Sequence, residues 1–395
     1  MNIAVIGGGG RVGLPLSVLL ATAGHHVSAI DVDEARVALI RSGSAPFSEE
    51  GLDDLLKKVL VTNQLRIDSD VAVLKANPVD VVFVVVGTDL DEEGQPQNHS
   101  VMTAVTQIKP YITEHTVVAL RSTVMPGTTE LIIGLLNGQS KRIAYCPERI
   151  AEGKAIEELG QIPQIVGCDS STGAFSVLQE IFKSLGVESL LATPREAEIG
   201  KLVLNTWRYS QFAIANEFLF LCEQHETSYQ RIRKLISYQY PRAVGLAGAG
   251  LAGGPCLEKD TKQLLAGLNN QSRLFEEVIR THSEMSEYVL ASLRQHFQLP
   301  DVVVALLGIT FKPDSDDLRS SPALELAQKL HLHVQQLLVV DPHLTSAIPF
   351  PLVTLDEALA KCDVVIIGTQ HAMFSNIKFE VPVINFSAER CLHLP

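Results

Sequence analysis

The sequence predicts an α/β protein, because short apolar runs rich in valine and isoleucine alternate with helical patterns over the first part of the chain. Ile3 to Ile6, Val27 to Ile30 and Val79 to Val86 are runs of this kind. Continuous apolar runs of this length are typical of strands in a parallel sheet that helices cover on both faces. The chain has 395 residues, 46% of them hydrophobic, which is enough for two or three domains with cores of their own.

Two changes of pattern predict the domain organisation. One helical pattern runs from Pro194 to about His225, too long for an ordinary crossover, and indicates a connecting helix or a dimer element. Helical stretches near 228–237 and 272–297 follow, and strand-like runs return at 302–307, 337–340 and 364–367. We therefore expect a sheet domain over residues 1–195, an all-helical central domain over 196–298 and a smaller α/β domain over 299–395.

The composition disfavours several kinds of partner. The formal charge of -13 argues against nucleic acid or an anionic membrane as the main partner. The cysteines show no CxxC or other metal spacing, so we expect neither a disulfide framework nor a metal site. No apolar run reaches membrane-spanning length and the chain enters a strand at once, so we expect a cytoplasmic protein. The cysteines are Cys146, Cys168, Cys222, Cys256, Cys362 and Cys391.

A glycine-rich turn separates the first predicted strand from the first helix. It contains Gly8-x-Gly10-x-x-Gly13, and Asp31 ends the next strand. Such glycines let backbone N–H groups approach a pyrophosphate at a helix N-terminus, and the acid accepts hydrogen bonds from ribose hydroxyls. We therefore expect NAD rather than NADP. Gly7 and Gly9 leave the register open by one residue.

Arg36 complicates the choice between NAD and NADP. It is either a solvated helix residue or a group that accepts a 2′-phosphate. The expected cofactor contacts are Gly8, Gly10, Arg11, Val12, Gly13, Asp31, Arg36, Thr88, Ser122 and Thr123.

Cys256 lies at the end of a glycine-rich loop, with Lys259 and Asp260 shortly after it. A thiol is a useful nucleophile only as the thiolate, and a nearby cation or a helix N-terminus lowers its pKa. Lys259 and a helix predicted to begin near Cys256 would supply both. The alternative is that Cys256 is a small buried hydrophobic residue, as most cysteines outside disulfides are.

Two loops that follow predicted strands carry further polar side chains. Ser122 and Thr123 precede a helix opened by a Pro-Gly pair, so they either face a nicotinamide or cap that helix. Glu148 and Glu152 follow the strand that ends near residue 146. Ligands bind at the carboxyl edge of a parallel sheet, although glutamates in a loop are usually only solvated.

Further charged or polar side chains appear at two more places. Lys201 and Asn205 lie four residues apart on the long predicted helix and so share one face, either as functional groups or as an exposed pair. Lys312 and Arg319 follow the first strand of the last domain and are either phosphate ligands or ordinary loop charges.

Taken in order, these segments resemble the UDP-glucose/GDP-mannose dehydrogenase family over nearly the whole chain. The resemblance implies Rossmann-like first and last domains, with NAD in the first and a UDP-sugar in the last. It also implies homodimers or larger homo-oligomers that form through the long helix, and a role in polysaccharide biosynthesis. The segments are GGGGRVGLPL, DVDEARV, SGSAPFSEEGL, VVGT, STVMPGTT, CPERIAEGKA, EIGKLVLN, ANE, GGPCLEKDT and FKPDSDDLRSSP.

The resemblance implies a four-electron oxidation of the sugar's C6 alcohol to a carboxylate. Cys256 would form a thiohemiacetal and then a thioester, which water hydrolyses. Lys201 and Asn205 would stabilise the oxyanion at C6, and Asp260 would hold the catalytic water or help to activate the thiol. The resemblance further implies that Thr123, Glu148 and Glu152 position or deprotonate water, without separating the two glutamates.

The resemblance also implies a set of substrate contacts. Arg242 resembles an arginine that reaches the substrate of a neighbouring subunit, while Lys312 and Arg319 match positions that face the active site. The implied contacts are Glu148, Arg149, Lys201, Asn205, Arg242, Gly253, Gly254, Lys259, Lys312 and Arg319.

Some positions depart from the family pattern. The residue before the cysteine is Pro255, where serine or histidine is common in the family. Proline is common at the positions of Glu258 and Asp89. The segment PERIAEGK resembles the branch that acts on UDP-N-acetylhexosamines, such as UDP-N-acetylmannosamine and UDP-N-acetylglucosamine. Three alternatives stay open at this point: a UDP-glucose 6-dehydrogenase, a two-electron hydroxyacid-type dehydrogenase, and a catalytically silent NAD or nucleotide sensor.

Overall fold

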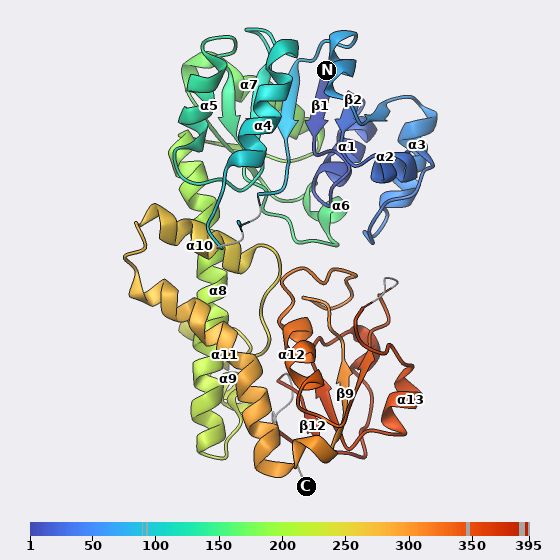
Figure 1. The fold of residues 1–395 in the computed structure, drawn as a ribbon. Coiled ribbons are helices and arrows are strands. Elements are labelled where there is room, and N and C mark those ends of the chain that lie inside the picture. The colour runs from blue at the N-terminus through green and yellow to red at the C-terminus, as the bar shows by residue number, and fades with distance from the viewer. Residues whose placement is uncertain (89, 92–93, 345–347, 387–391, 394–395) are drawn as a thin grey trace. The chain divides into compact units, whose positions relative to one another are not determined.

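The computed structural model describes residues 1–88, 90, 91, 94–344, 348–386, 392 and 393, and the chain divides into two units (Figure 1). The first comprises Met1–Leu204 with Lys262–Asn269, and the second comprises Asn205–Thr261 with Asn270–Pro395. Asp89 and Cys391 lie outside the described residues. The domain boundaries expected at 195/196 and 298/299 stay predictions.

The first unit contains a mostly parallel sheet whose described strands follow the order β3-β2-β1-β4-β5-β6-β7-β8. The strand order reverses between β1 and β4, as in a doubly wound fold. One pair departs from the expected parallel sheet, because β6 and β7 are antiparallel. The connection over residues 146–163 contains only the short α6, in place of the longer crossover helix that usually joins parallel strands. The strands are β1 (Asn2–Ile6), β2 (His26–Ile30), β3 (Leu65–Asp68), β4 (Val81–Val84), β5 (Val117–Leu120), β6 (Ile143–Tyr145), β7 (Gln164–Cys168) and β8 (Ser189–Ala192).

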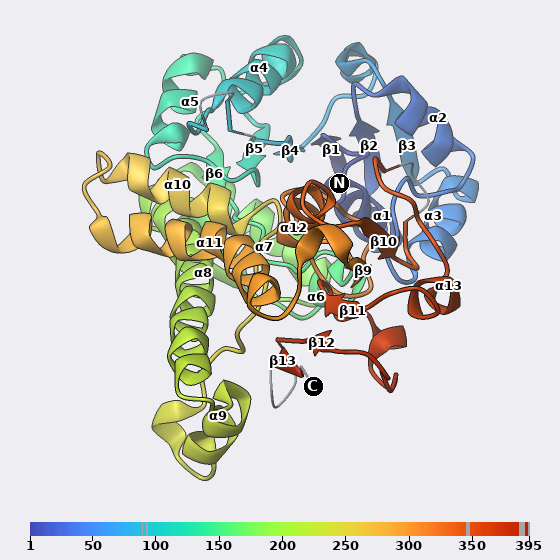
Figure 2. The same ribbon diagram turned by 60° about the horizontal axis from the view of Figure 1, so that its bottom comes forward.

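Helices cover both faces of this sheet because its strands are apolar on both sides. Ile3 and Val5 pack into one core with α1, α2, α3, α6 and α7, while Ala4 and Ile6 pack into a second core with α4 and α5. Helices α4 and α5 lie side by side on their face (Figure 1; Figure 2). The helices are α1 (Gly13–Thr22), α2 (Glu34–Arg41), α3 (Leu52–Val61), α4 (His99–Ile108), α5 (Thr128–Leu136), α6 (Ala155–Glu158) and α7 (Ala174–Ser184).

The helices expected in the middle of the chain are present as α8 (Pro194–Gln224), α9 (Tyr229–Ser237) and α11 (Arg273–His296). The helix expected near the cysteine is α10 (Leu257–Gly267), which begins immediately after Cys256. None of the helices among the described residues is both long enough and apolar enough to cross a membrane.

The second unit contains a smaller sheet, in which the described strands follow the order β10-β9-β11-β12-β13. All its pairs are parallel except β12 with β13. One face packs against α11 and α12, and the other packs against α13 and the segment around Phe374. The elements are β9 (Val303–Leu307), α12 (Pro322–His331), β10 (Gln336–Val340), α13 (Leu355–Leu359), β11 (Val364–Ile367), β12 (Val383–Ile384) and β13 (Leu392–His393).

Candidate active site

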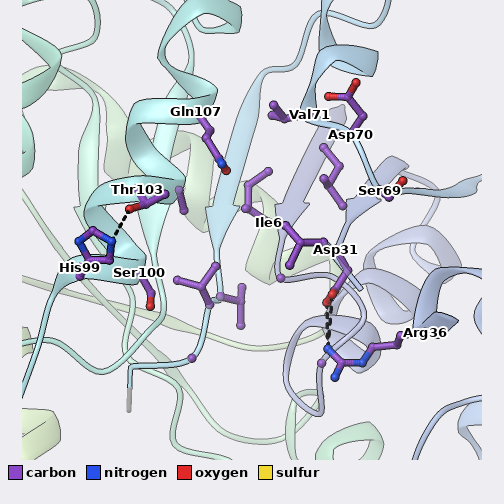
Figure 3. A pocket seen from close by; sticks show the side chains of 18 residues that line it. Ile6, Asp31, Arg36, Ser69, Asp70, Val71, His99, Ser100, Thr103 and Gln107 are labelled. Atoms are coloured by element: carbon purple, nitrogen blue, oxygen red, sulfur yellow. Dashed lines mark hydrogen bonds and ion pairs between the residues drawn. The ribbon is translucent and has the colours of Figure 1, made fainter. Parts of the chain in front are cut away.

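The first unit has a cavity of about 650 Å³ where its strand order reverses. Ligands of doubly wound sheets bind at this position, beyond the carboxyl ends of the strands. Asp31, Arg36 and Asp70 line one side of it, and His99 and Thr103 of α4 line the other (Figure 3). The cavity therefore lies where the sequence predicted a dinucleotide.

The glycine-rich turn leaves no room for a side chain at most of its glycines. Gly7 has a φ of +82°, a conformation that residues with a Cβ rarely adopt. A Cβ at Gly13 would lie 2.1 Å from the carbonyl oxygen of Gly7, so α1 begins directly against the turn. A Cβ at Gly10 would meet only that same oxygen, at 3.5 Å, and Gly10 lines the cavity. Its backbone is therefore open to a ligand, as the Gly8-x-Gly10-x-x-Gly13 register requires.

Asp31 is buried and oriented by the turn. Its Oδ2 accepts the backbone N–H of Gly9 at 3.0 Å, and Arg36 Nη1 lies 3.4 Å from both carboxylate oxygens (Figure 3). Arg36 also pairs with Asp33 at 3.4 Å. A 2′-phosphate would have to approach the Asp31 carboxylate, whereas ribose hydroxyls can donate to it, so this arrangement fits NAD.

The loop before α5 is fixed by a buried acid that the sequence analysis did not single out. Glu198 of α8 is fully buried, and its carboxylate accepts the backbone N–H groups of Gly127 and Thr129 at 2.7 and 2.8 Å. A carboxylate at a helix N-terminus is favourable because the first N–H groups of a helix have no partner within it. The available signal was an acidic residue among apolar neighbours on the long helix.

The expected residues of this loop lie next to the strand ends. Ser122 is buried, and its Oγ donates to the carbonyl of Val86 at 2.7 Å, which ties the end of β5 to the segment after β4. Thr88 is buried and Thr123 is half-buried. Ser122 therefore has a structural hydrogen bond, and Thr123 is the more accessible of the two neighbours.

Glu148 is buried against an arginine that the sequence analysis also missed. Arg121 is 2% exposed and pairs with Glu148, and it donates to Gln164 Oε1 at 3.2 Å. Glu148 Oε1 also accepts the backbone N–H groups of Arg149 and Ile150 at 2.8 and 3.1 Å. Burial raises the pKa of the Glu148 carboxyl, but Arg121 and these N–H groups outweigh burial and hold it below its ordinary value. Glu148 is therefore an anion that organises its own loop.

Glu152 has a different partner. Its Oε1 lies 2.9 Å from Arg11 Nη1, and the Arg11 guanidinium lies over the ring of Phe47, 5.2 Å from its centroid. The pair connects the glycine-rich turn to the 146–155 loop. Arg149, the neighbour of Glu148, donates to the carbonyl of Pro163.

Three of the expected catalytic residues lie together in the second unit. Cys256 is exposed at the start of α10, and its carbonyl accepts the N–H of Asp260 at 2.8 Å. Asp260 is fully buried, and its Oδ2 accepts a hydrogen bond from Asn205 Nδ2 at 2.5 Å. Asn205 is thus held one helical turn from the cysteine. Lys201 precedes Asn205 by one turn of α8, is 9% exposed and belongs to the first unit.

The glycines before the cysteine pack closely against the chain itself. A Cβ at Gly254, where φ is +99°, would lie 2.3 Å from the ring of Phe311. A Cβ at Gly253 would lie 2.5 Å from the ring of Pro322. Gly254 also donates its N–H to the carbonyl of Ser320 at 2.9 Å. The loop that carries Cys256 is therefore seated on the segment that follows β9.

A second cavity, of about 290 Å³, lies beside this loop. It is lined by the glycine- and alanine-rich segment 248–252 and by residues at the carboxyl ends of β9 and β11. The lining includes Phe212, Phe311, Thr369, Gln370 and Asn385.

The expected substrate cations of the second unit differ in their surroundings. Lys312 and Lys259 are half-buried. Arg319 is exposed and is held by Asp317, whose carboxylate oxygens lie 3.0 and 2.9 Å from Arg319 Nε. Arg242 is exposed, and its guanidinium lies 6.0 Å from the centroid of the Tyr240 ring.

Three family models together match most of the chain. They are the NAD binding domain, the central domain and the UDP binding domain of the UDP-glucose/GDP-mannose dehydrogenase family, at residues 1–186, 195–287 and 305–385. The chain belongs to this family. The family resemblance, the fold class and the NAD cofactor predicted from the sequence are thereby confirmed, and the protein is an NAD-dependent nucleotide-sugar dehydrogenase.

Individual relatives agree with the family assignment. The chain is 29% identical to the UDP-N-acetyl-D-mannosamine dehydrogenase of Methanococcus aeolicus over 96% of this chain and 87% of that one. It is also 29% identical to a UDP-glucose 6-dehydrogenase of Bacillus subtilis, over 94% and 88%. The solved UDP-D-ManNAc dehydrogenase of Pyrococcus horikoshii superposes with a TM-score of 0.90 at 25% identity, covering 100% of this chain and 98% of that one.

Substituting Asp31→Asn is expected to weaken NAD binding about 10- to 100-fold, because a hydrogen bond to a charged group contributes about 1.5–3 kcal/mol. Calorimetric titration with NAD and NADP would measure both affinities, and the ratio should move toward NADP as Arg36 loses one of its two carboxylate partners. Asp70→Asn is the matched control, since Asp70 lines the same cavity and asparagine can keep its cap to Ala72. Unchanged NAD affinity in the Asp31 variant would contradict this assignment.

Substituting Glu148→Gln is expected to destabilise the protein by about 3–5 kcal/mol, because it leaves Arg121 charged and buried without its counter-ion. Urea unfolding would measure the loss, with the 79% exposed Glu114→Gln as control.

The same pair predicts a pH dependence. The folded pKa of Glu148 lies below its ordinary value of 4.5, so the pair stabilises the protein above that value. This contribution is lost as the pH falls through the lower, folded pKa. An acid-unfolding profile of Glu148→Gln with the same slope as wild type would argue against it.

Proposed function

We propose that the protein oxidises the C6 alcohol of a UDP-sugar to the carboxylate in two NAD-dependent steps, with a UDP-N-acetylhexosamine as the favoured substrate. The observation that carries the proposal is the exposed Cys256 at the start of α10, with the buried Asn205–Asp260 pair one turn away. A helix N-terminus lowers a thiol pKa, and the pair offers an oriented amide donor. A two-electron dehydrogenase would need no such thiol.

In the proposed chemistry, one carbon–sulfur bond forms between Cys256 and C6 of the sugar and later breaks. NAD, when bound, accepts one hydride in each of the two oxidations. After the first oxidation, which also releases a proton, the Cys256 thiolate adds to the C6 aldehyde and the oxyanion takes up a proton. The thiohemiacetal loses a hydride and a proton to become a thioester. Water then attacks the thioester, the carbon–sulfur bond breaks, and the carboxylate, the thiolate and two protons are released.

The surrounding residues suit different steps of this reaction. The carboxylate of Asp260 holds one N–H of the Asn205 amide, so the other is available to an oxyanion at C6, where we also place Lys201. The lowered pKa of Glu148 makes it a weak base. We therefore assign loop positioning to Glu148 and the orientation of the hydrolytic water to Glu152 and Thr123.

Cys256 is suited to this role in a way that a buried cysteine is not. Burial raises the pKa of Cys146 to about 12, which leaves that thiol protonated and inert at neutral pH. Cys256 is exposed and directly precedes the first residue of α10.

The UDP-binding family model and the relatives' names support the substrate. The 290 Å³ cavity falls largely within residues 305–385 and the glycine-rich segment, and we propose that it receives the nucleotide. Both UDP-N-acetyl-D-mannosamine and UDP-glucose dehydrogenases are among the relatives, and the PERIAEGK segment favours the former. The uronate would serve polysaccharide biosynthesis in the cytoplasm, where the thiols stay reduced.

The wild-type enzyme is expected to produce two NADH per uronate, and Cys256→Ala is expected to produce no uronate. NADH absorbance and chromatography of the products would be followed with UDP-N-acetylmannosamine, UDP-N-acetylglucosamine and UDP-glucose. Cys362→Ala, which removes a buried thiol, should keep the stoichiometry of two. One NADH per sugar would favour the two-electron alternative, and NAD binding without any reduction would favour a sensor.

We further propose that α8 and α9 form a homodimer interface. Large apolar side chains recur along one side of α8 at heptad-like spacing, and Trp207 among them is 58% exposed. Exposed apolar stripes of this kind mark interaction surfaces. The exposed members on the two helices include Trp207, Ile214, Phe218, Leu221, Ile232, Leu235 and Ile236.

The double substitution Trp207→Glu with Phe218→Glu is expected to give monomers, because it places charges in the apolar stripe. Light scattering on a size-exclusion column would measure the mass. Leu332→Glu, at a residue that is 77% exposed in the last domain, is the control and should leave the mass unchanged. A wild-type monomer would rule the interface out.

A further inference from the structure

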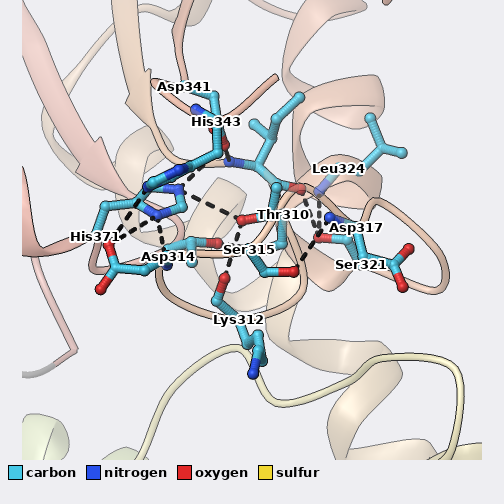
Figure 4. A network of polar contacts seen from close by, with 12 residues as sticks. Thr310, Lys312, Asp314, Ser315, Asp317, Ser321, Leu324, Asp341, His343 and His371 are labelled. Atoms are coloured by element: carbon cyan, nitrogen blue, oxygen red, sulfur yellow. Dashed lines mark hydrogen bonds and ion pairs between the residues drawn. The ribbon is translucent and has the colours of Figure 1, made fainter. Parts of the chain in front are cut away.

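A buried histidine joins three strand ends in the C-terminal sheet. His371, which is 0% exposed, follows β11, and its Nε2 lies 3.2 Å from Oδ2 of Asp341, at the end of β10. Its Nδ1 lies 2.9 Å from the backbone nitrogen of Asp314, in the segment after β9 (Figure 4). None of the family roles described above involves this histidine.

These contacts define the tautomer of His371. A backbone N–H can only donate, so Nδ1 accepts from Asp314 and carries no proton. Nε2 then carries the proton and donates it to Asp341. His371 therefore joins a carboxylate and a backbone amide that lie on different segments.

The same contacts argue against a metal ion. The Asp314 carboxylate, His343 and His371 offer ligand atoms within 4.8 Å of one another. However, the Nδ1 lone pair that would bind a metal already accepts the Asp314 N–H. Loop anchoring accounts for this cluster without breaking that hydrogen bond.

The anchored segment is the loop from Ile309 to Ser321. At its start, Asp341 Oδ2 accepts the N–H of Ile309 at 2.8 Å. At its end, Ser321 Oγ donates to the carbonyl of Ile309 at 2.7 Å. Within it, Phe311 donates its N–H to the carbonyl of Asp317 at 3.0 Å. The loop is therefore closed on itself, with the His371–Asp341 pair at its base.

This loop supports the cysteine loop. Its Phe311 ring and Ser320 carbonyl make the close contacts to Gly254 described above, and Gly254 is two residues before Cys256. Lys312 extends from the same loop, away from His371 (Figure 4). Contacts within one unit thus connect His371 to the backbone that sets the direction of the thiol.

We propose that His371 is a positioning residue that fixes the 309–321 loop and, through Phe311 and Ser320, the orientation of Cys256. The catalytic part of this inference rests on the proposed function, in which Cys256 is the nucleophile. Its geometric part does not, because it concerns the accessibility and direction of a thiol. A misplacement of about 1 Å at a reacting group can cost about 100-fold in rate.

Two substitutions separate the two hydrogen bonds of the ring. Asparagine can accept near the Nδ1 position, so His371→Asn keeps the bond from Asp314 and loses the donor to Asp341. Glutamine reaches the Nε2 position, so His371→Gln keeps the donor to Asp341. His333→Asn, at an exposed histidine of the same sheet domain, is the control.

The first readout is the alkylation rate of Cys256 by iodoacetamide without substrates, followed by peptide mass spectrometry. We expect the alkylation rate to change at least about fivefold in His371→Asn and to recover partly in His371→Gln. The rate in the control His333→Asn should equal that of the wild type. The second readout is steady-state kinetics, in which kcat should fall about 10- to 100-fold in His371→Asn while the affinity for NAD is unchanged.

Wild-type alkylation and kcat in both His371 variants, at a temperature where circular dichroism shows them folded, would overturn the proposal. Activity that chelators abolish and zinc restores, together with loss of bound zinc in the variants, would overturn it in favour of a metal site. If the wild type oxidised no UDP-sugar, the proposed function would fail, while the alkylation rates would still decide the positioning role.

Discussion

A charged group buried at a strand end has to be compensated within the protein, and this constraint shapes the loops of both sheets. Desolvation of a lone charge costs several kcal/mol, so each buried charge is held by a partner or by backbone N–H groups. Arg121 with Glu148, Glu198 with the start of α5, and Asp341 with His371 are examples. Each pair joins segments that are distant in the sequence.

The compensated charges support the groups that we expect to meet ligands. Glu148 organises the loop that contains Glu152, and Glu198 holds the loop that contains Thr123. In the second unit, Asp260 orients Asn205. Functional groups are more effective when their geometry is fixed in advance, and here buried neighbours provide the fixing.

Membership of the UDP-glucose/GDP-mannose dehydrogenase family accounts for the fold and the cofactor, while individual positions distinguish this chain. Glu258, where the family often has proline, lines a cavity of about 320 Å³ with Tyr209 and His282. Burial lowers the pKa of His282 to about 4, so this histidine is neutral where it stacks on Tyr209. The first turn of α10 thus packs against an uncharged aromatic pair.

The α/β class, the NAD-binding turn, the long helices and the family could be predicted from the sequence alone, because these depend on local periodicity and on motifs of contiguous residues. The sequence also indicated Cys256, Asn205 and Asp260 as candidates. Only the tertiary structure showed that β7 is antiparallel to β6 and that Glu148 is paired with Arg121. It alone showed which groups His371 contacts, because the partners of a buried polar group come from segments far apart in the chain, and no local pattern encodes which of them meet.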